Sequence, residues 1–257
     1  MLPPPKHQNN LATGVFYYTE GLRLLLHPKL RPYILVPLLV NIVLFTFLTG
    51  VMLHYFGGLI DWATAFIPTW LAPLAFLAWI LLGILMLIIY GYSFNMITNI
   101  IAAPFYGLLS MKTEELLTGK TPPDESLLRM IPRVMWRELC KLWYFFSRGL
   151  VVVLVMILVG TIPLVQILAP LIGLAWGAWS MAIQYADYPA DNNQKNFKTL
   201  RNCLWQKKFS STGFGAFIML CSVIPIVNIF AMPAAVTGGT YLWLRELKSC
   251  QEGACQI

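Results

Sequence analysis

Charged residues are scarce in this sequence of 257 residues. Asp, Glu, Lys and Arg together make up 11% of it, whereas hydrophobic residues make up 58% and the mean hydropathy is +0.68. A water-soluble domain of this length needs far more polar side chains to cover its surface. The scarcity of charge therefore excludes an ordinary soluble globular domain.

Catalytic and metal-binding patterns are also missing. His7, His27 and His54 fall in separate segments, and the five cysteines form no CxxC pair and no His–Cys ligand spacing. TGKT at 118–121 resembles the end of a phosphate-binding loop, but Glu114 stands where that motif requires its first glycine. No HExxH, GxSxG or Ser-x-x-Lys arrangement occurs. We therefore expect no enzyme, no ATPase, no cofactor and no metal site.

What the sequence has in abundance is uncharged apolar runs, namely Pro32–Ile60, Trp62–Met111, Gly149–Ala186 and Phe209–Leu244. Each run meets or exceeds the ~20 residues that cross the hydrocarbon core of a bilayer as a helix. A backbone in lipid must satisfy its own hydrogen bonds, which a helix does, and these runs lack the alternation of strands. The sequence therefore predicts an all-α integral membrane protein.

The basic residues indicate its orientation. Lys and Arg concentrate in four segments: four of them in 1–31, seven in 112–148, five in 195–208 and two in 245–248. None falls in 54–70, so the positive-inside rule places both termini in the cytoplasm and 54–70 outside. Two crossings follow, Tyr33–Leu53 outward and Leu74–Phe94 back. The net charge of +7 is thus an orientation signal, and we expect no nucleic-acid partner.

The last two apolar runs are each interrupted by prolines at their centre. The arms that remain have about 10–14 residues, fewer than the ~17 of a full span, so each run predicts a re-entrant helical hairpin. Two short transmembrane pairs are the alternative. IPLVQILA (Ile162–Ala169) and IPIVNIFA (Ile224–Ala231) match at five of eight positions, which suggests a structural repeat. Pro170 and Pro233 are expected to open the second arms.

Such paired interruptions point to the substrate site in many transporters. The alternative is that both are loop tips built from the same turn chemistry. Gln166 and Asn228 occupy corresponding places in the two repeats and would supply amide donors. We treat them as candidate pore residues at the hairpin tips.

Two basic patterns lie near the predicted crossings. Arg129, Arg133, Arg137 and Lys141 are four residues apart and share one face of an amphipathic interfacial helix. This stripe either sits among lipid headgroups or concentrates anions at a pore entrance. The acids of QYADYPADNN (184–193) either cap a helix or pair with the stripe, and Pro189 is expected to end that helix.

HPKLRPY, residues 27–33, stands where the first crossing begins. A helix N-terminus offers unpaired N–H groups and the positive end of the helix dipole, and Arg31 adds a forked contact for a tetrahedral anion. The alternative is an interfacial anchor in which Lys29 and Arg31 hold membrane lipids.

Taken together, these patterns predict one membrane domain, 1–257, with two long transmembrane helices, two Pro-interrupted re-entrant hairpins and interfacial amphipathic helices. Its segments are 1–32 (cytoplasmic or interfacial), 33–53 (transmembrane), 54–73 (periplasmic), 74–111 (long transmembrane helix with cytoplasmic extension), 112–148 (basic cytoplasmic or interfacial region), 149–186 (first hairpin), 187–208 (cytoplasmic loop), 209–244 (second hairpin) and 245–257 (tail).

Six segments occur in order between residues 35 and 240: LVPLLVNIVLF, NIIAAPFYGLLSMKTEE, TGKTPPDES, IPRVMWRE, QYADYPADNN and IPIVNIFAMPAAVTGGT. Together they closely resemble the CysZ family of bacterial inner-membrane sulfate permeases. The resemblance implies sulfate uptake for cysteine biosynthesis by a homo-oligomer, without an ATPase subunit. A membrane scaffold or bilayer-shaping protein that transports nothing is the alternative.

The resemblance also implies a sulfate-binding motif of the Gly-Leu-Arg type before the first crossing. Its distance to the following PLLVN puts it on Lys29, Leu30 and Arg31, with Lys29 in place of the glycine. Pro32 stands where a second Arg is common, and it removes an N–H donor. The second choice is a literal copy of the motif at Gly21, Leu22 and Arg23.

Overall fold

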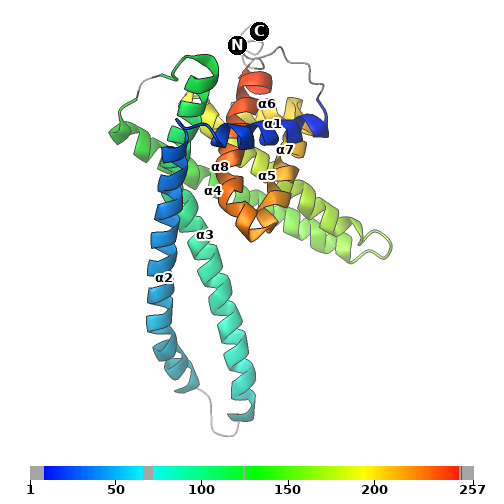
Figure 1. The fold of residues 1–257 in the computed structure, drawn as a ribbon. Helices are drawn as coiled ribbons and strands as arrows, with labels where there is room; N and C mark the ends of the chain where they lie inside the picture. Colours follow the sequence, from blue (N-terminus) through cyan, green and yellow to red (C-terminus); the bar gives the residue numbers. More distant parts are fainter. Residues whose placement is uncertain (1–8, 66–71, 124, 249, 251–257) are drawn as a thin grey trace. The chain divides into compact units, whose positions relative to one another are not determined.

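The computed structural model describes residues 9–65, 72–123, 125–248 and 250. Its elements, in chain order, are α1 (Leu11–Leu25), α2 (Arg31–Ala65), α3 (Ala72–Thr118), α4 (Leu127–Gly160), α5 (Leu168–Asn192), α6 (Phe197–Gln206), α7 (Lys208–Val223), α8 (Pro225–Leu242) and the π-helical turn η2 (Trp243–Leu247) (Figure 1). No strand occurs within these described ranges, which confirms the all-α prediction there. The chain forms two compact units, one of Met1–Val36 with Ala103–Ile257 and the other of Pro37–Ala102.

In the smaller unit, α2 and α3 contact each other through polar and aromatic side chains. The hydroxyls of Thr49 and Tyr90 lie 2.7 Å apart, and the ring of Phe94 meets that of Phe45 edge-on, with centroids 5.8 Å apart. Large apolar side chains elsewhere on both helices are exposed, including Leu39, Val43, Phe47, Leu81, Leu85 and Leu87. Helices that are apolar on their outer faces are suited to lipid.

Among the described residues, the segment Leu128–Gly160 of α4 is long and apolar enough to cross a membrane. None of its most apolar window is buried inside the protein. Shorter apolar helical stretches occupy Ile42–Gly58, Trp79–Phe94 and Lys208–Val223. By its length and composition, this helix could therefore cross a bilayer.

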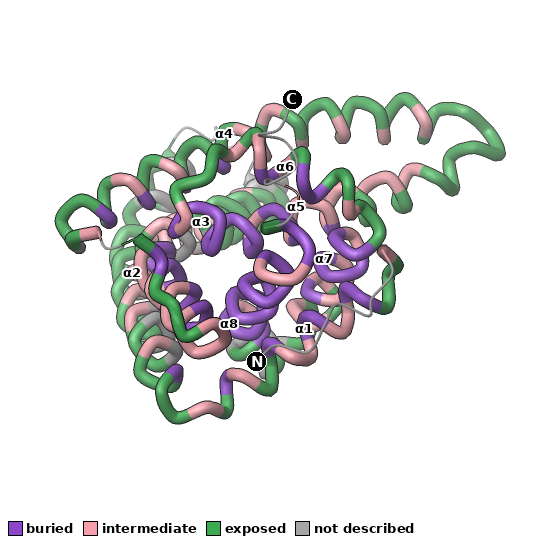
Figure 2. Tube along the Cα trace, turned by 90° about the horizontal axis from the view of Figure 1, so that it is seen from above, coloured by how far each residue is buried: buried purple, intermediate pink, exposed green. Residues whose placement is uncertain are grey.

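The core of the larger unit lies where α1 and α5 each cross both arms of the α7–α8 hairpin (Figure 2). The backbones touch at glycines: a Cβ at Gly215 of α7 would lie 1.8 Å from the carbonyl oxygen of Ala178 in α5. Glycine is therefore needed for the helices to approach this closely, as in small-residue packing between membrane helices. Gly238 and Gly239 of α8 make similar close contacts, with Tyr17 of α1 and Tyr185 of α5 respectively.

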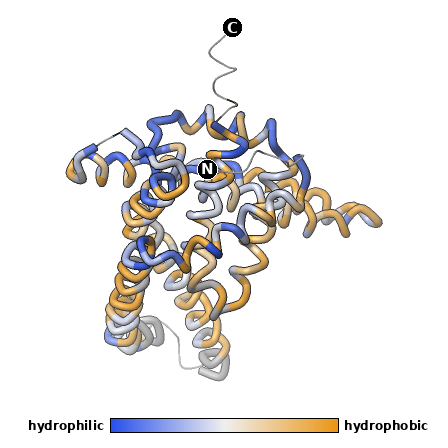
Figure 3. Tube along the Cα trace, turned by 45° about the horizontal axis from the view of Figure 1, so that its top comes forward, coloured by the Kyte–Doolittle hydropathy of each residue, from blue (hydrophilic) through white to orange (hydrophobic). Residues whose placement is uncertain are grey.

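The two hairpins turn in different ways, although their sequences align. Residues 161–167 form a non-helical turn between α4 and α5, with Leu164 in the left-handed region at φ 69°. The exposed residues around this tip include Ile162, Leu164 and Ile167, and the hairpin is largely in the hydrophobic colour along its trace (Figure 3). In the second hairpin, Ile224 alone separates α7 from α8.

Helix α8 begins at Pro225, so the expectation that Pro233 opens the second arm is wrong, and Pro233 lies inside the helix. Proline is favoured in the first turn because its fixed φ suits a helix and its missing N–H would be unpaired there anyway. Pro170 does lie in the first turn of α5, as expected.

Pro189 lies inside α5, which continues to Asn192, so the expected helix end at this proline is also wrong. A proline leaves the carbonyl four residues earlier, here that of Tyr185, without its usual helical donor. Gly239 of α8 packs against this carbonyl, since a Cβ there would lie 2.5 Å from the oxygen. Packing against α8 thus outweighs the local preference of proline to break the helix.

Candidate functional site

The α1–α2 turn contains the expected motif Lys29, Leu30 and Arg31. Helix α1 ends at Leu25, and the backbone N–H of Leu30 donates to the carbonyl of His27 at 3.0 Å. Leu30 is fully buried, whereas Lys29 and Arg31 are exposed. Leu30 therefore anchors the turn, and its two basic neighbours face outward.

Arg31 is the first residue of α2, and its Nη2 donates to the carbonyl of Leu26 at 3.3 Å. It has no carboxylate partner among the described residues. The first turn of α2 contains no acidic side chain either. Pro32 has no N–H, and the N–H of Tyr33 donates to the carbonyl of Leu30 at 3.1 Å. The positive charge that suits an anion here is therefore that of Arg31 together with the positive end of the helix dipole.

An apolar groove of about 520 Å³ lies beside Arg31. Its lining comes from α1, the start of α2 and α8, through Leu22, Leu25, Leu26, Arg31, Leu35 and Phe230. Arg31 is the charged member of this lining, and Leu22 belongs to the second-choice motif. The two alternative motifs therefore border the same groove.

The other two residues of the second-choice motif are engaged elsewhere. The carbonyl of Gly21 accepts a hydrogen bond from Thr237 Oγ1 at 2.9 Å, and a Cβ on Gly21 would lie 2.4 Å from the carbonyl oxygen of Ala234. Arg23 is 78% exposed and pairs with Glu20 at 2.7 Å. Gly21 thus holds α1 against α8, and the charge of Arg23 is partly neutralised.

The candidate pore residues lie at or near the hairpin turns. Gln166 is exposed in the α4–α5 turn, where its backbone N–H donates to the carbonyl of Ile162 at 3.1 Å. Asn228 falls in the first turns of α8, and its side chain lies outside the described residues.

The basic stripe of α4 forms an ion-pair ladder with α5, made of Arg133, Arg137 and Lys141 against Asp187 and Asp191. Arg137 binds both acids, with Nη2 at 2.7 Å from Asp187 and Nη1 at 3.0 Å from Asp191. Arg133 also pairs with Asp191, and Lys141 Nζ lies 3.2 Å from Asp187. Both sets are spaced by four residues, so each lies on one helical face.

The inner end of this ladder is buried. The side chains of Lys141 and Glu138 are 2% and 3% exposed and lie 2.6 Å apart, and the ring of Tyr188 covers the ammonium at 4.6 Å. Burial raises the pKa of Asp191, whereas Arg137 and Arg133 act to lower it. Charges this deep persist only when they are paired, so the ladder joins α4 to α5.

The stripe therefore divides into two parts. Arg133 and Arg137, which the sequence suggested for a pore entrance, are neutralised by carboxylates, including Glu125 at 2.7 Å from Arg133. Arg129 is exposed and has no carboxylate partner within the described part of the chain. Of the two roles open to the acids in 184–193, pairing with the stripe is the one that the structure contains.

Besides Glu138 of the ladder, sequence reasoning missed two buried carboxylates. Glu246 accepts from the Tyr17 hydroxyl at 2.8 Å and pairs with Lys207 at 3.0 Å. Glu114 accepts from the side-chain amide of Asn193 at 2.8 Å. Single acids in separate segments carry no spacing signal, so only the folded chain shows these contacts.

The sequence profile of the sulfate transporter CysZ/etoposide-induced protein 2.4 family matches residues 17–233. This chain belongs to that family. Proteins named sulfate transporter CysZ are similar to it over most of its length. The one from Pseudomonas aeruginosa is 40% identical over 238 residues, which cover 91% of this chain and 95% of that protein.

Other CysZ relatives show the same extent of similarity. The protein from Pectobacterium atrosepticum is 39% identical over 254 residues, which cover 95% of this chain and 90% of the relative. The protein from Salmonella typhimurium is 39% identical over 238 residues, covering 90% and 92%. The range matched by the CysZ profile includes Arg31, the whole ion-pair ladder and the start of α8.

Proposed function

We propose that this protein is a permease that carries sulfate across the bacterial inner membrane into the cytoplasm for cysteine biosynthesis. The observation that carries the proposal is 40% identity over 91% of the chain to a protein named sulfate transporter. The matching proteins are named as transporters, so we assign transport and no enzymatic activity to this protein. The exposed apolar surface of α4 supports a membrane location.

The proposed topology follows from charge and helix length. We infer that α2 and α3 cross the bilayer, with both termini in the cytoplasm. The α4–α5 and α7–α8 hairpins enter from the cytoplasmic side and turn back within the bilayer. The exposed apolar tip of the first hairpin, where Leu164 is 93% exposed, supports this reading, because such a tip is stable in hydrocarbon.

We propose that sulfate binds at Arg31 and the N-terminal turn of α2. Sulfate is a dianion, and bare charge in hydrocarbon costs on the order of tens of kcal/mol. The exposed guanidinium, which no described carboxylate pairs with, supports this assignment together with its place at the positive end of the α2 dipole. Lys29 lies on the same exposed turn and adds positive charge, whereas Leu30 fixes its shape.

The remaining candidates have supporting roles in the proposal. Arg129, the uncompensated end of the basic stripe, attracts anions to a cytoplasmic opening, while Arg133 and Arg137 hold α4 to α5. Gln166 and Asn228 donate amide hydrogen bonds along a path formed by the hairpins of several copies. No ATPase subunit takes part in this scheme.

Flux of radiolabelled sulfate into liposomes that contain the purified protein tests the function. We expect uptake above that of protein-free liposomes, driven by the sulfate gradient without ATP and suppressed by excess unlabelled sulfate. Uptake equal to that of protein-free liposomes, with the protein correctly inserted, would contradict transport and favour a scaffold that shapes the bilayer.

A further inference from the structure

Helix α6 has two chemically different faces. Leu200, Cys203 and Leu204 are buried against the protein. The other face carries Lys198, Arg201, Asn202 and Trp205, whose spacing of three, four and seven residues places them on one side of the helix. This second face, and not the first, is available to a ligand.

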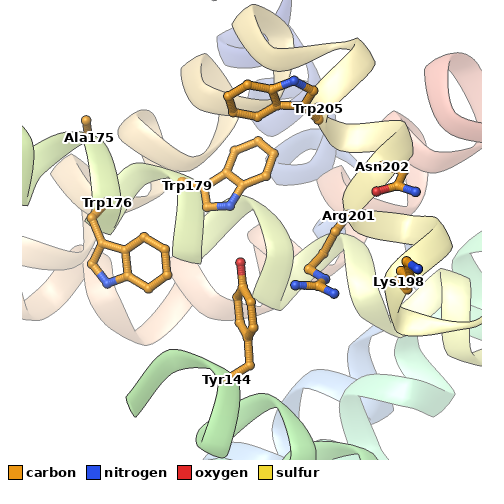
Figure 4. A pocket seen from close by; sticks show the side chains of 8 residues that line it. All are labelled: Tyr144, Ala175, Trp176, Trp179, Lys198, Arg201, Asn202 and Trp205. Carbon is orange, nitrogen blue, oxygen red and sulfur yellow. The ribbon is translucent and has the colours of Figure 1, made fainter. Parts of the chain in front are cut away.

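The polar face of α6 closes a pocket of about 530 Å³ together with α4 and α5 (Figure 4). The lining residues are Tyr144, Ala175, Trp176, Trp179, Lys198, Arg201, Asn202 and Trp205. In Figure 4 the Arg201 side chain extends from α6 towards the Tyr144 ring, while Asn202 and Lys198 project from the same helix. The pocket is separate from the Arg31 groove and from the ion-pair ladder.

Arg201 is held in place but its charge is not compensated. Its guanidinium lies 4.6 Å from the centre of the Tyr144 ring and 5.1 Å from that of Phe197. Its Nε is buried and has no hydrogen-bond partner in the described part of the chain. A buried donor without a partner in a positioned cation indicates a missing acceptor, and a carboxylate of this chain does not supply it within the described residues.

Lys198 and Asn202 strengthen this reading. Neither side chain forms an ion pair or hydrogen bond with another described residue. The ladder residues Arg133, Arg137 and Lys141, by contrast, all bind carboxylates. The cations on α6 thus face an open pocket, and together they provide five or more N–H donors for one anionic group.

The rest of the pocket is aromatic and continues into an apolar surface. Trp179 and Trp205 meet edge-on with ring centres 5.8 Å apart, and Tyr144 lies 6.2 Å from Trp176. Trp and Tyr gather at the headgroup level of membrane proteins. Towards the hairpin tip, α5 exposes further apolar side chains, including Leu171 and Leu174.

We propose that this pocket binds the phosphate of an anionic phospholipid. Arg201, Lys198 and Asn202 contact the phosphate oxygens, and the acyl chains run along Trp176 and the exposed apolar face of α5. A free inorganic anion shares the phosphate chemistry but leaves the aromatic wall and its apolar continuation without a partner. The bound lipid joins α4, α5 and α6 at the base of the first hairpin.

The test uses the full-length protein in detergent, titrated with dioleoyl-phosphatidylglycerol and followed by thermal unfolding. A lipid that binds the folded state raises the unfolding temperature by mass action. We expect Lys198→Gln and Arg201→Gln to weaken the apparent affinity about tenfold, the loss typical of a charge-assisted contact. Lys195→Gln is the charge-matched control, because it removes an exposed cation that lies just before α6 and does not line the pocket. We expect this variant to keep the parent affinity.

Three results would overturn the proposal. The first is stabilisation by phosphatidylcholine as strong as that by phosphatidylglycerol. The second is a loss of affinity in Lys195→Gln as large as that in Lys198→Gln. The third is an equal stabilisation by inorganic sulfate or phosphate that disappears in Lys198→Gln, which would make the pocket a free-anion site. Lys198 is exposed, so its variant remains informative even where Arg201→Gln fails to fold.

Discussion

At the start of α2, Arg31 is exposed and lacks a carboxylate partner among the described residues. Arg23, eight residues earlier, is also exposed but pairs with Glu20. The two arginines belong to the two alternative sulfate motifs, and of the two only Arg31 lines the groove. Substituting each in turn therefore distinguishes the motifs.

We predict that Arg31→Ala weakens sulfate binding by about tenfold to a hundredfold, because it removes a charge-assisted contact worth about 1.5–3 kcal/mol. The measurement is the sulfate-dependent rise in unfolding temperature of the purified protein. Arg23→Ala removes the same charge and should leave the sulfate dependence near that of the parent. The assignment to Arg31 is wrong if Arg23→Ala has the larger effect.

Lys141 pairs with Glu138, three residues earlier, and Lys112 pairs with Glu115, three residues later. The first pair is buried and the second is exposed to solvent. Lys141 and Glu138 are buried at 2.6 Å, whereas Lys112 is 41% exposed and lies 2.7 Å from Glu115. Lys141→Met leaves Glu138 and Asp187 without this cation, which we expect to cost about 3–5 kcal/mol of unfolding free energy. Unfolding in detergent, followed by tryptophan fluorescence, measures the loss.

Lys112→Met is the matched control for Lys141→Met. A surface pair of this kind contributes about 0–1 kcal/mol, so the variant should unfold close to the parent. Equal losses in the two variants would show that the buried ladder does not determine stability.

Residue spacing revealed part of the ladder but not its partners. The four-residue repeat from Arg129 to Lys141 is visible in the sequence, and so are the acids Asp187 and Asp191. Pairing them requires the antiparallel register of α4 and α5, which depends on the length of the turn at 161–167. Spacing alone left helix capping and pairing as equal alternatives.

At the scale of elements, the helices of the larger unit are held together by backbone contact at glycines. We predict that Gly215→Ala destabilises the protein by about 1–3 kcal/mol or more, because the added Cβ would meet the carbonyl oxygen of Ala178 at 1.8 Å. Thermal unfolding and the fraction of monodisperse protein after purification report the effect.

Gly50→Ala in α2 provides the control, since nothing lies within 4 Å of a Cβ there. Alanine favours the helix over glycine by about 1 kcal/mol, so this variant should be neutral or slightly stabilised. A Gly215→Ala protein as stable as Gly50→Ala would mean that α5 and α7 can separate without loss.

The prolines show how far element boundaries follow from sequence. Pro170 lies in the first turn of α5, as expected, but Pro225 rather than Pro233 opens α8. Both assignments satisfy the local chemistry of proline, because either residue could begin a helix. Which one does so depends on the packing of α8 between α1 and α5, and that packing also keeps α5 helical through Pro189.

At the scale of the whole molecule, the composition and apolar runs were enough to predict the all-α class. The six motifs in order were enough to identify the family. The Arg31 turn followed from its position before the first apolar run. The groove beside it did not, because Phe230 joins its lining from a helix about two hundred residues away in sequence. The α6 pocket could not be predicted from the sequence for the same reason, since its lining residues come from three separate helices.

The proposed re-entrant topology can be tested by labelling cysteines placed at three positions along the chain. In a cysteine-free background, Gln166→Cys should resist a membrane-impermeant thiol reagent added from the periplasmic side, because its hairpin turns back inside the bilayer. His54→Cys lies in the segment assigned outside and should react from that side, whereas Lys195→Cys should react only after the cytoplasmic face is opened. All three side chains are exposed in the folded chain, so burial in the protein does not limit their reaction. Labelling of Gln166→Cys from the periplasm as complete as that of His54→Cys would mean that α4 and α5 span the membrane fully, and the hairpin would then be a transmembrane pair.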